Sequence, residues 1–144
     1  NDHYRNNFDV ALAHMVFHTV EDLTKALANI ALYLRSDGYL IFSIPHPCFF
    51  SFYKAEISNN GYNYIVPSRY NISFTVSNDP TPLPEQVPYF HRPLSVYFDL
   101  LHACGFYAEK VLEPFPGSEL ISEYTSVWDY PRYMIFICRK HDKG

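Results

Sequence analysis

Two short apolar runs and one helical repeat open the chain. Residues 8–13 and 39–44 are mostly apolar, which is typical of buried strands. Between them, apolar residues recur at the spacing of one helix face: Leu23, Leu27, Ile30, Ala31 and Leu34. A strand, a helix and a strand joined by short loops predict a right-handed unit with two parallel strands. Their near-continuous apolar character favours a parallel sheet that is covered on both faces.

Capping residues predict where the first helix begins and ends. Thr19 is suited to the N-cap position, and Asp22 three residues later approximates a capping box. Asp37-Gly38 predicts a turn at the other end of the helix. We therefore expect the second strand to begin at Tyr39.

Residues 48–92 follow a different pattern, with Asn59-Asn60-Gly61 and then five prolines. From residue 70 to residue 76 apolar and polar residues alternate, which predicts a half-buried strand, and residues 62–66 are its expected hairpin partner. The segment is far longer than a usual strand-to-helix connection. It therefore predicts a β-rich cap inserted into the fold.

The last third of the chain predicts one more helix and two strands. Pro93 fits the first helical position and Gly105 a C-terminal stop, so we expect a helix over residues 93–104. Phe106–Leu112 and residues 133–138 are apolar enough for strands. The stretch 113–132 carries three prolines and a glycine and predicts a loop. Without a helix between them, the last two strands should be antiparallel, within one domain over residues 1–144.

Composition narrows the classes of partner. The net charge is −4 and no basic run occurs, which argues against nucleic acid or an anionic membrane surface as a partner. No apolar stretch approaches the roughly 18 residues of a membrane span, and no signal peptide opens the chain. Three widely spaced cysteines indicate reduced thiols in a cytoplasmic protein. Aromatic residues make up 18% of the chain, enough for a core and for an apolar pocket.

Four motifs, in this order, resemble the C-terminal half of a class I S-adenosylmethionine-dependent methyltransferase. They are FDVALAH (8–14), LRSDGYL (34–40), IPHPCF (44–49) and YFHRPLS (89–95). The first resembles the family's fourth strand, and the second its turn before strand 5, with Ser36 and Asp37 in place of the common Pro and Gly. The last two resemble signatures of a bacterial small-molecule subgroup. The resemblance implies an α/β fold: a partial Rossmann-like sheet with strands in the order 4-5-7-6, the last strand antiparallel, and the inserted cap.

The chain departs from the family pattern at its start. The family needs an early glycine-rich turn and, about 20 residues later, an acidic residue for the ribose. The five glycines of this chain include no G-x-G pair, so strands 1 to 3 and most of the cofactor site are expected to be absent. We therefore expect this chain alone to bind S-adenosylmethionine weakly or not at all. The first strand would then be a sheet edge that pairs with another chain, as in a homo-oligomer, or is covered by residues 1–7.

The resemblance also implies where the site lies. Ligands of open parallel sheets bind beyond the carboxyl ends of the strands. The residues just past the first strand are therefore the expected cofactor-side residues: Ala13, His14, Met15 and Val16. His46, just past the second strand, should share that rim, together with Tyr89 and His91 of the cap on the substrate side.

The expected reaction is methyl transfer from S-adenosylmethionine to a small organic acceptor, which the apolar, tyrosine-rich cap favours. A histidine suits the removal of an acceptor proton, because its reference pKa of about 6.5 lies near neutral pH. We expect His46 to contact the acceptor or take this proton, and His14 is the second candidate.

Other interpretations of the same residues stay open. His46 lies between two prolines and could simply fix its loop by hydrogen bonds. His14 and His18 have the spacing of a helical metal pair, but no third ligand is evident, so we predict no metal site. Cys48 is too close to His46 along one rigid loop for good nucleophile geometry. The chain could also be a non-catalytic binding module that keeps only this half of the fold, whereas a hydrolase is disfavoured because no G-x-S-x-G motif occurs.

Overall fold

The computed structural model describes residues 2–73, 85–121 and 128–141. Its strands are β1 (Phe8–His14), β2 (Leu34–Pro45), β3 (Ser68–Ile72), β4 (Val87–His91), β5 (Phe106–Leu112) and β6 (Tyr133–Lys140). Its α-helices are α1 (Leu23–Tyr33), α2 (Ala55–Ser58), α3 (Leu94–Ala103) and α4 (Ser118–Ile121). Three short 3-10 turns complete the described elements: η1 (Asp2–Tyr4), η2 (Phe17–Thr19) and η3 (Phe50–Phe52).

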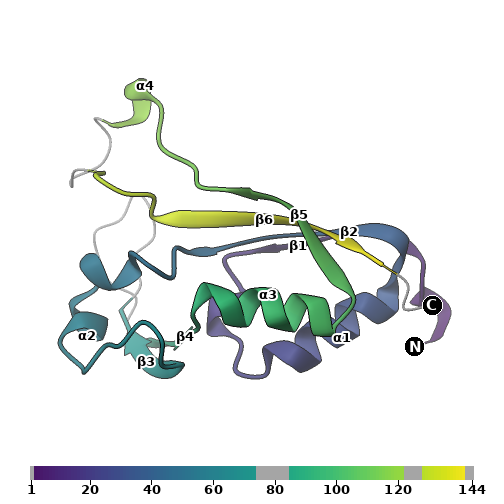
Figure 1. The fold of residues 1–144 in the computed structure, drawn as a ribbon, viewed down its shortest axis with the longest axis horizontal. Coiled ribbons are helices and arrows are strands. Elements are labelled where there is room, and N and C mark those ends of the chain that lie inside the picture. Colours follow the sequence, from purple (N-terminus) through teal and green to yellow (C-terminus); the bar gives the residue numbers. More distant parts are fainter. Residues whose placement is uncertain (1, 74–84, 122–127, 142–144) are drawn as a thin grey trace.

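The larger sheet has the predicted topology. Its four strands lie in the order β1-β2-β6-β5 (Figure 1). β1 and β2 are parallel, and β6 runs antiparallel to both of its neighbours, β2 and β5. β1, β2, β6 and β5 thus take the places of strands 4, 5, 7 and 6, and β6, the last strand of the chain, is antiparallel. The predicted α/β fold is confirmed.

Helices α1 and α3 lie on the same side of this sheet (Figure 1). The core between the sheet and these helices is apolar, and at its centre the rings of Phe42 and Phe136 stack with centroids 4.6 Å apart. On β6 the alternate residues Met134, Phe136 and Cys138 are buried, whereas Ile135 and Ile137 are only half-buried. We call the side away from α1 and α3 the open face. The expectation of a sheet covered on both faces is therefore wrong for the described residues.

The first helix begins later and ends earlier than predicted. Asp22, not Thr19, is the N-cap, and its carboxylate accepts a hydrogen bond of 2.9 Å from the Lys25 backbone N–H. Thr19 belongs to η2, where its hydroxyl donates to the Val16 carbonyl. Leu34 matches the helical repeat but is already in β2, because it leaves the helix with an extended backbone.

The turn expected at Asp37-Gly38 lies within β2. Asp37 has a left-handed backbone with φ of 59°, as a turn residue would. A Cβ at Gly38 would come within 2.9 Å of the Arg35 carbonyl oxygen and 3.1 Å of the Asp9 carbonyl oxygen. The close approach of β1 and β2 therefore requires glycine here.

The predicted cap segment forms a separate small sheet with different pairing from that expected. β3 pairs antiparallel with β4, and not with residues 62–66. The part of the expected strand at residues 74–76 lies outside the described residues. The two strands share an apolar cluster with η3 and α2: Phe50, Ile57, Tyr70, Ile72 and Tyr89. Local alternation identified β3, but the distant partner strand carries Pro88 and gives a weak strand signal.

The C-terminal half of the chain follows the prediction with small differences. Pro93 is the N-cap of α3 rather than its first helical residue, and Gly105 follows its end with φ of 81°. The stretch 113–132, predicted as a loop, contains α4. This short helix stands away from the sheet (Figure 1).

Strand β1 forms an exposed edge of the sheet. Phe8, Val10 and Leu12 are 47%, 51% and 74% exposed. The backbone N–H groups of Asn6 and Asn7 donate to carbonyls at the end of α1 and not to the edge of β1. The expectation that residues 1–7 cover this edge is therefore wrong for the described residues 2–7.

Candidate functional site

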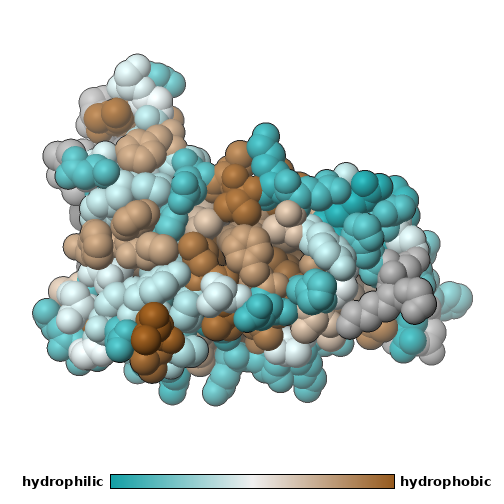
Figure 2. All heavy atoms as spheres, viewed as in Figure 1, coloured by the Kyte–Doolittle hydropathy of each residue, from teal (hydrophilic) through white to brown (hydrophobic). Residues whose placement is uncertain are grey.

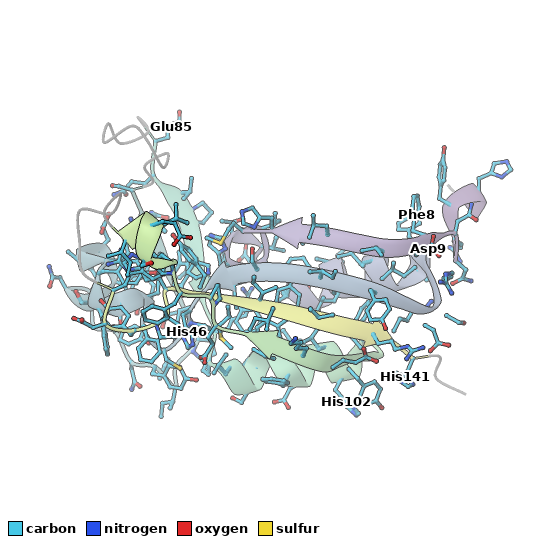
Figure 3. All side chains as sticks on the ribbon, turned by 90° about the horizontal axis from the view of Figure 1, so that it is seen from above. Phe8, Asp9, His46, Glu85, His102 and His141 are labelled. Atoms are coloured by element: carbon cyan, nitrogen blue, oxygen red, sulfur yellow. The ribbon has the colours of Figure 1, made fainter. Side chains whose placement is uncertain are left out.

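The carboxyl ends of β1 and β2 lie at the same end of the sheet, as predicted. The parallel pairing sets His14 beside Ser43, and the Met15 N–H donates to the Ser43 carbonyl over 3.0 Å. Figure 3 places His46 at the end toward which β1 points, and Phe8 and Asp9 at the opposite end. Parallel strands open onto one rim in this way, so the segments that follow β1 and β2 form one candidate site.

Ser43 fixes the first of the cofactor-side residues. Its hydroxyl lies 2.7 Å from His14 Nδ1 and accepts a hydrogen bond of 3.1 Å from the Met15 N–H. Met15 has a left-handed backbone with φ of 53°, uncommon for a residue with a side chain. Left-handed residues held by their surroundings are frequent at functional sites.

The four cofactor-side candidates differ in what they present. His14 and Val16 are exposed, and Nε2 of His14 is the ring nitrogen left for a ligand. Ala13 packs against the core, so its side chain is turned away from a ligand on the open face. The half-buried Met15 contributes mainly its strained backbone.

His46 is buried and held at both ring nitrogens. Its Nδ1 accepts a hydrogen bond of 3.2 Å from the Cys48 N–H, and its Nε2 lies 2.7 Å from a carboxylate oxygen of Glu113. An Nδ1 that accepts from a backbone N–H carries no proton, so Nε2–H is the nitrogen that donates to Glu113. This arrangement fixes the loop after β2, and Nδ1 can take a proton only by giving up its bond to the Cys48 N–H.

The two substrate-side candidates lie inside the cap. Tyr89 is 3% and His91 1% exposed. The Tyr89 ring packs on Phe50 at 4.7 Å, and His91 Nε2 donates to the Tyr64 carbonyl over 2.8 Å. His91 also borders an open hollow of about 340 Å³ beside β3 and β4. Tyr89 thus supports the cap from inside, and His91, although almost fully buried, is among the residues that line the hollow.

His18 is a further buried histidine in the segment that follows β1. Its side chain is buried, its Nδ1 has no hydrogen-bond partner among the described residues, and its ring lies 6.0 Å from that of Tyr89. Burial lowers the pKa of His18 to about 4, so the ring is neutral near pH 7. Only the tertiary packing of η2 against β4 produces this environment, and no local pattern predicts it.

His14 and His18 do not lie on one helix. The strand end, the left-handed Met15 and the η2 turn separate them, and His14 is exposed while His18 is buried. Among the described residues, no group of three or more His, Cys, Asp or Glu side chains is arranged to hold a metal ion.

Within the same part of the chain, the helices are too short or too polar to cross a membrane.

Aromatic rings surround the loop that carries His46. Phe49 lies 4.6 Å from His46 and 5.4 Å from Tyr130, measured between ring centroids. Tyr130 also stacks near Tyr53, and the Arg132 guanidinium lies 4.9 Å from the centroid of the Tyr53 ring. This end of the sheet therefore offers flat apolar surfaces next to the candidate site.

Comparison with known proteins agrees with this geometry. A family model described as "Methyltransferase domain" matches residues 3–42. An S-adenosylmethionine-dependent methyltransferase structure reported for Listeria monocytogenes aligns with a TM-score of 0.72 and 22% identity, covering 96% of this chain and 64% of the other. One from Mesorhizobium loti aligns with a TM-score of 0.63 and 19% identity, covering 94% and 64%. No curated protein sequence matches the chain.

A third structure contains ligands. It is the 1,6-didemethyltoxoflavin-N1-methyltransferase of Burkholderia thailandensis with bound 1,6-didemethyltoxoflavin and S-adenosylhomocysteine. It aligns with a TM-score of 0.57 and 18% identity, covering 96% of this chain and 46% of the other.

The fold is thus that of the S-adenosylmethionine-dependent methyltransferases, and the resemblance seen in the sequence is confirmed at this level. The chain spans about two thirds of the length of the Listeria and Mesorhizobium structures, 64% in each case.

Proposed function

We propose that this chain forms the acceptor-side part of a methyltransferase that moves a methyl group from S-adenosylmethionine to a small organic molecule. The observation that carries the proposal is the shared rim of β1 and β2, where the His14 and His46 segments meet. The alignment of 96% of the chain with a methyltransferase structure supports it.

The residues after β1 fit the cofactor in this proposal. S-adenosylmethionine supplies an electrophilic methyl group on a sulfonium. His14 presents Nε2, and Met15 offers a fixed backbone turn, beside the exposed side chain of Val16. These residues, with the backbone of Ala13, would hold and orient the cofactor from one side. Much of the catalysis of such an in-line displacement is positioning and exclusion of water.

The acceptor would enter from the cap side, near His91 and the aromatic rings around His46. Tyr89 would shape the acceptor pocket from beneath, by supporting His91 and Phe50. Apolar, aromatic walls suit a small organic molecule better than a polyanion, and the net charge of −4 agrees with this choice. An acceptor that must lose its proton would pass it to His46 Nδ1 in place of the Cys48 N–H bond, and Glu113 at Nε2 would stabilise the imidazolium that forms.

Titration calorimetry with S-adenosylmethionine tests the proposal. We expect weak or no binding by this chain alone and clear binding by the longest polypeptide its gene encodes. Methyl transfer from labelled cofactor to a panel of small organic acceptors then identifies the substrate class. A longest polypeptide that binds no cofactor would contradict the proposal and favour a non-catalytic binding module.

Substitutions at His46 separate a proton-transfer role from a loop-fixing role. His46→Ala in the active protein should lower turnover, and Glu113→Gln should lower it less, because the hydrogen bond to Nε2 survives in part. Addition of imidazole should restore part of the activity if the missing group carries a proton. Unchanged turnover in His46→Ala would leave His46 with the loop-fixing role alone.

A further inference from the structure

Arg92 joins two segments of the candidate site that are far apart in the sequence. It lies between β4 and α3, and its side chain is buried, with 8% of the residue exposed. Its guanidinium donates to three carbonyls of the loop that follows β1: Val20 at 2.6 Å, Glu21 at 2.8 Å and Phe17 at 3.3 Å. A fourth bond of 3.4 Å goes to the Phe90 carbonyl in β4. One side chain thus holds the loop 15–21 and the cap hairpin β3–β4 together.

The chemistry of this contact is specific to arginine. A guanidinium keeps its charge at all ordinary pH values and has five N–H donors in a planar fork. Among the residues the structure describes, no carboxylate pairs with Arg92, and carbonyl oxygens and the Phe90 ring at 5.5 Å surround the charge. The Tyr97 hydroxyl is a further neighbour: burial raises the pKa of Tyr97 to about 12, and the charge of Arg92 opposes that rise.

Packing makes the same connection. His18 lies on the loop held by Arg92, and its ring is 6.0 Å from Tyr89 on the strand from which Arg92 extends. Phe17, whose carbonyl Arg92 binds, also inserts its ring into the main core at 5.0 Å from Phe42. The loop is therefore fixed on one side by the sheet and on the other by Arg92.

We propose that Arg92 is a positioning residue that couples the cofactor-side loop 15–21 to the acceptor-side hairpin β3–β4. The functional consequence rests on the proposed function: binding of the cofactor and binding of the acceptor would affect each other through the cap. The structural role of Arg92, which is to hold the loop against the hairpin, does not depend on that function. Loss of the guanidinium should release the loop from the hairpin while the main sheet stays folded.

Hydrogen exchange of the full chain tests whether Arg92 holds the loop 15–21. The Thr19 and Val20 amides, bonded to Val16 and Phe17 carbonyls, report on the loop. In Arg92→Lys their exchange should rise by about tenfold, because a single ammonium cannot replace the fork that spans the loop carbonyls and Phe90. Amides in β6 should change little. Arg69→Lys is the matched control, since exposed Arg69 also lies over the Phe90 ring, at 6.0 Å, but reaches no loop carbonyl in the described contacts.

Chemical rescue keeps the test decisive when a variant is unstable. Methylguanidinium added to Arg92→Ala should restore slow exchange in the loop, and methylammonium should not. Equal acceleration in the loop and in β6, or rescue by both cations, would overturn the proposal, because either result indicates general destabilisation. Unchanged exchange in Arg92→Lys would overturn it as well.

Binding measurements test the functional consequence separately. In the longest polypeptide that binds S-adenosylmethionine, Arg92→Lys should weaken cofactor binding and raise the acceptor KM by about tenfold each, with a smaller change in kcat. Unchanged affinities would overturn the coupling. If the wild-type polypeptide binds no cofactor, the proposed function fails, and the exchange experiment still decides whether Arg92 holds the loop.

Discussion

At the scale of single residues, two equally buried histidines, His18 and His46, differ in their hydrogen-bond partners. His18 is neutral near pH 7 because burial disfavours its charged form and lowers its pKa from 6.5 to about 4. His46 is equally buried, but it has a hydrogen-bond partner at each ring nitrogen. Two residues of one type thus differ through their neighbours alone.

The pKa of His18 predicts a loss of stability in acid. The folded-state pKa lies below the unfolded value of 6.5, so only the unfolded chain takes up the proton as the pH falls through this range. As the pH falls from about 7 to about 5, this residue should lower the free energy of unfolding by about 2 kcal/mol. His18→Gln should remove that part of the pH dependence in urea unfolding curves. His102→Gln, on the exposed side of α3, is the control, and an equal effect of both variants would contradict the assignment.

At the scale of elements, the ends of α1 differ from those that the capping residues and the apolar repeat predict. Asp22 caps the helix because Thr19 ends the η2 turn and the following Val20 is extended, which places Thr19 outside the helix. Asp22→Ala should therefore lower stability by about 1 kcal/mol, whereas Thr19→Ala should cost clearly less. Urea unfolding of the two variants checks this order. A larger loss for Thr19→Ala would return the N-cap to that residue.

The strand pair β1–β2 depends on one glycine. At Gly38 an added Cβ would meet two backbone oxygens, which cannot rotate away. Gly38→Ala should lower the free energy of unfolding by about 2 kcal/mol. At Gly61, with φ of 70° and no atom within 4 Å of an added Cβ, alanine should cost only the backbone strain, about 1 kcal/mol. Thermal or urea unfolding compares the two, and equal losses would show that close contact is not the cause at Gly38.

At the scale of the whole molecule, the sheet has one side packed and one side open. The helices α1 and α3 cover one face. The strand β1 leaves an exposed edge, and its Leu12 is 74% exposed. Exposed apolar residues also occur on α3 and β5. Figure 2 shows brown atoms gathered in the middle of the face that is turned to the viewer. An exposed apolar strand edge favours pairing with another chain.

We expect this edge to drive self-association of the chain, as the sequence predicts for its first strand. Leu12→Lys should lower the sedimentation coefficient toward that of a monomer, because a lysine on an edge strand opposes edge pairing. Ile65→Lys is the matched control, since Ile65 is also 74% exposed but lies in the cap segment. A wild-type chain that sediments as a monomer at all accessible concentrations would contradict this prediction.

The sequence by itself determined most of the elements and their order. The apolar runs located β1, β5 and β6, and the absence of a long helix between the last two predicted their antiparallel pairing. The motif order then predicted the rim that His14 and His46 share. These features depend on neighbouring residues, because hydrophobic periodicity and turn chemistry act within a few residues of one another.

The tertiary structure alone decided the features that join distant residues. The partner of β3, the neutral state of His18 and the hydrogen bonds of Arg92 to a loop more than 70 residues earlier all come from packing between separate elements. A buried arginine and an exposed one are written with the same letter, and only their surroundings distinguish them. The same reason explains why β2 begins at Leu34: a side chain that continues the helical repeat also fits the core as the first residue of the strand.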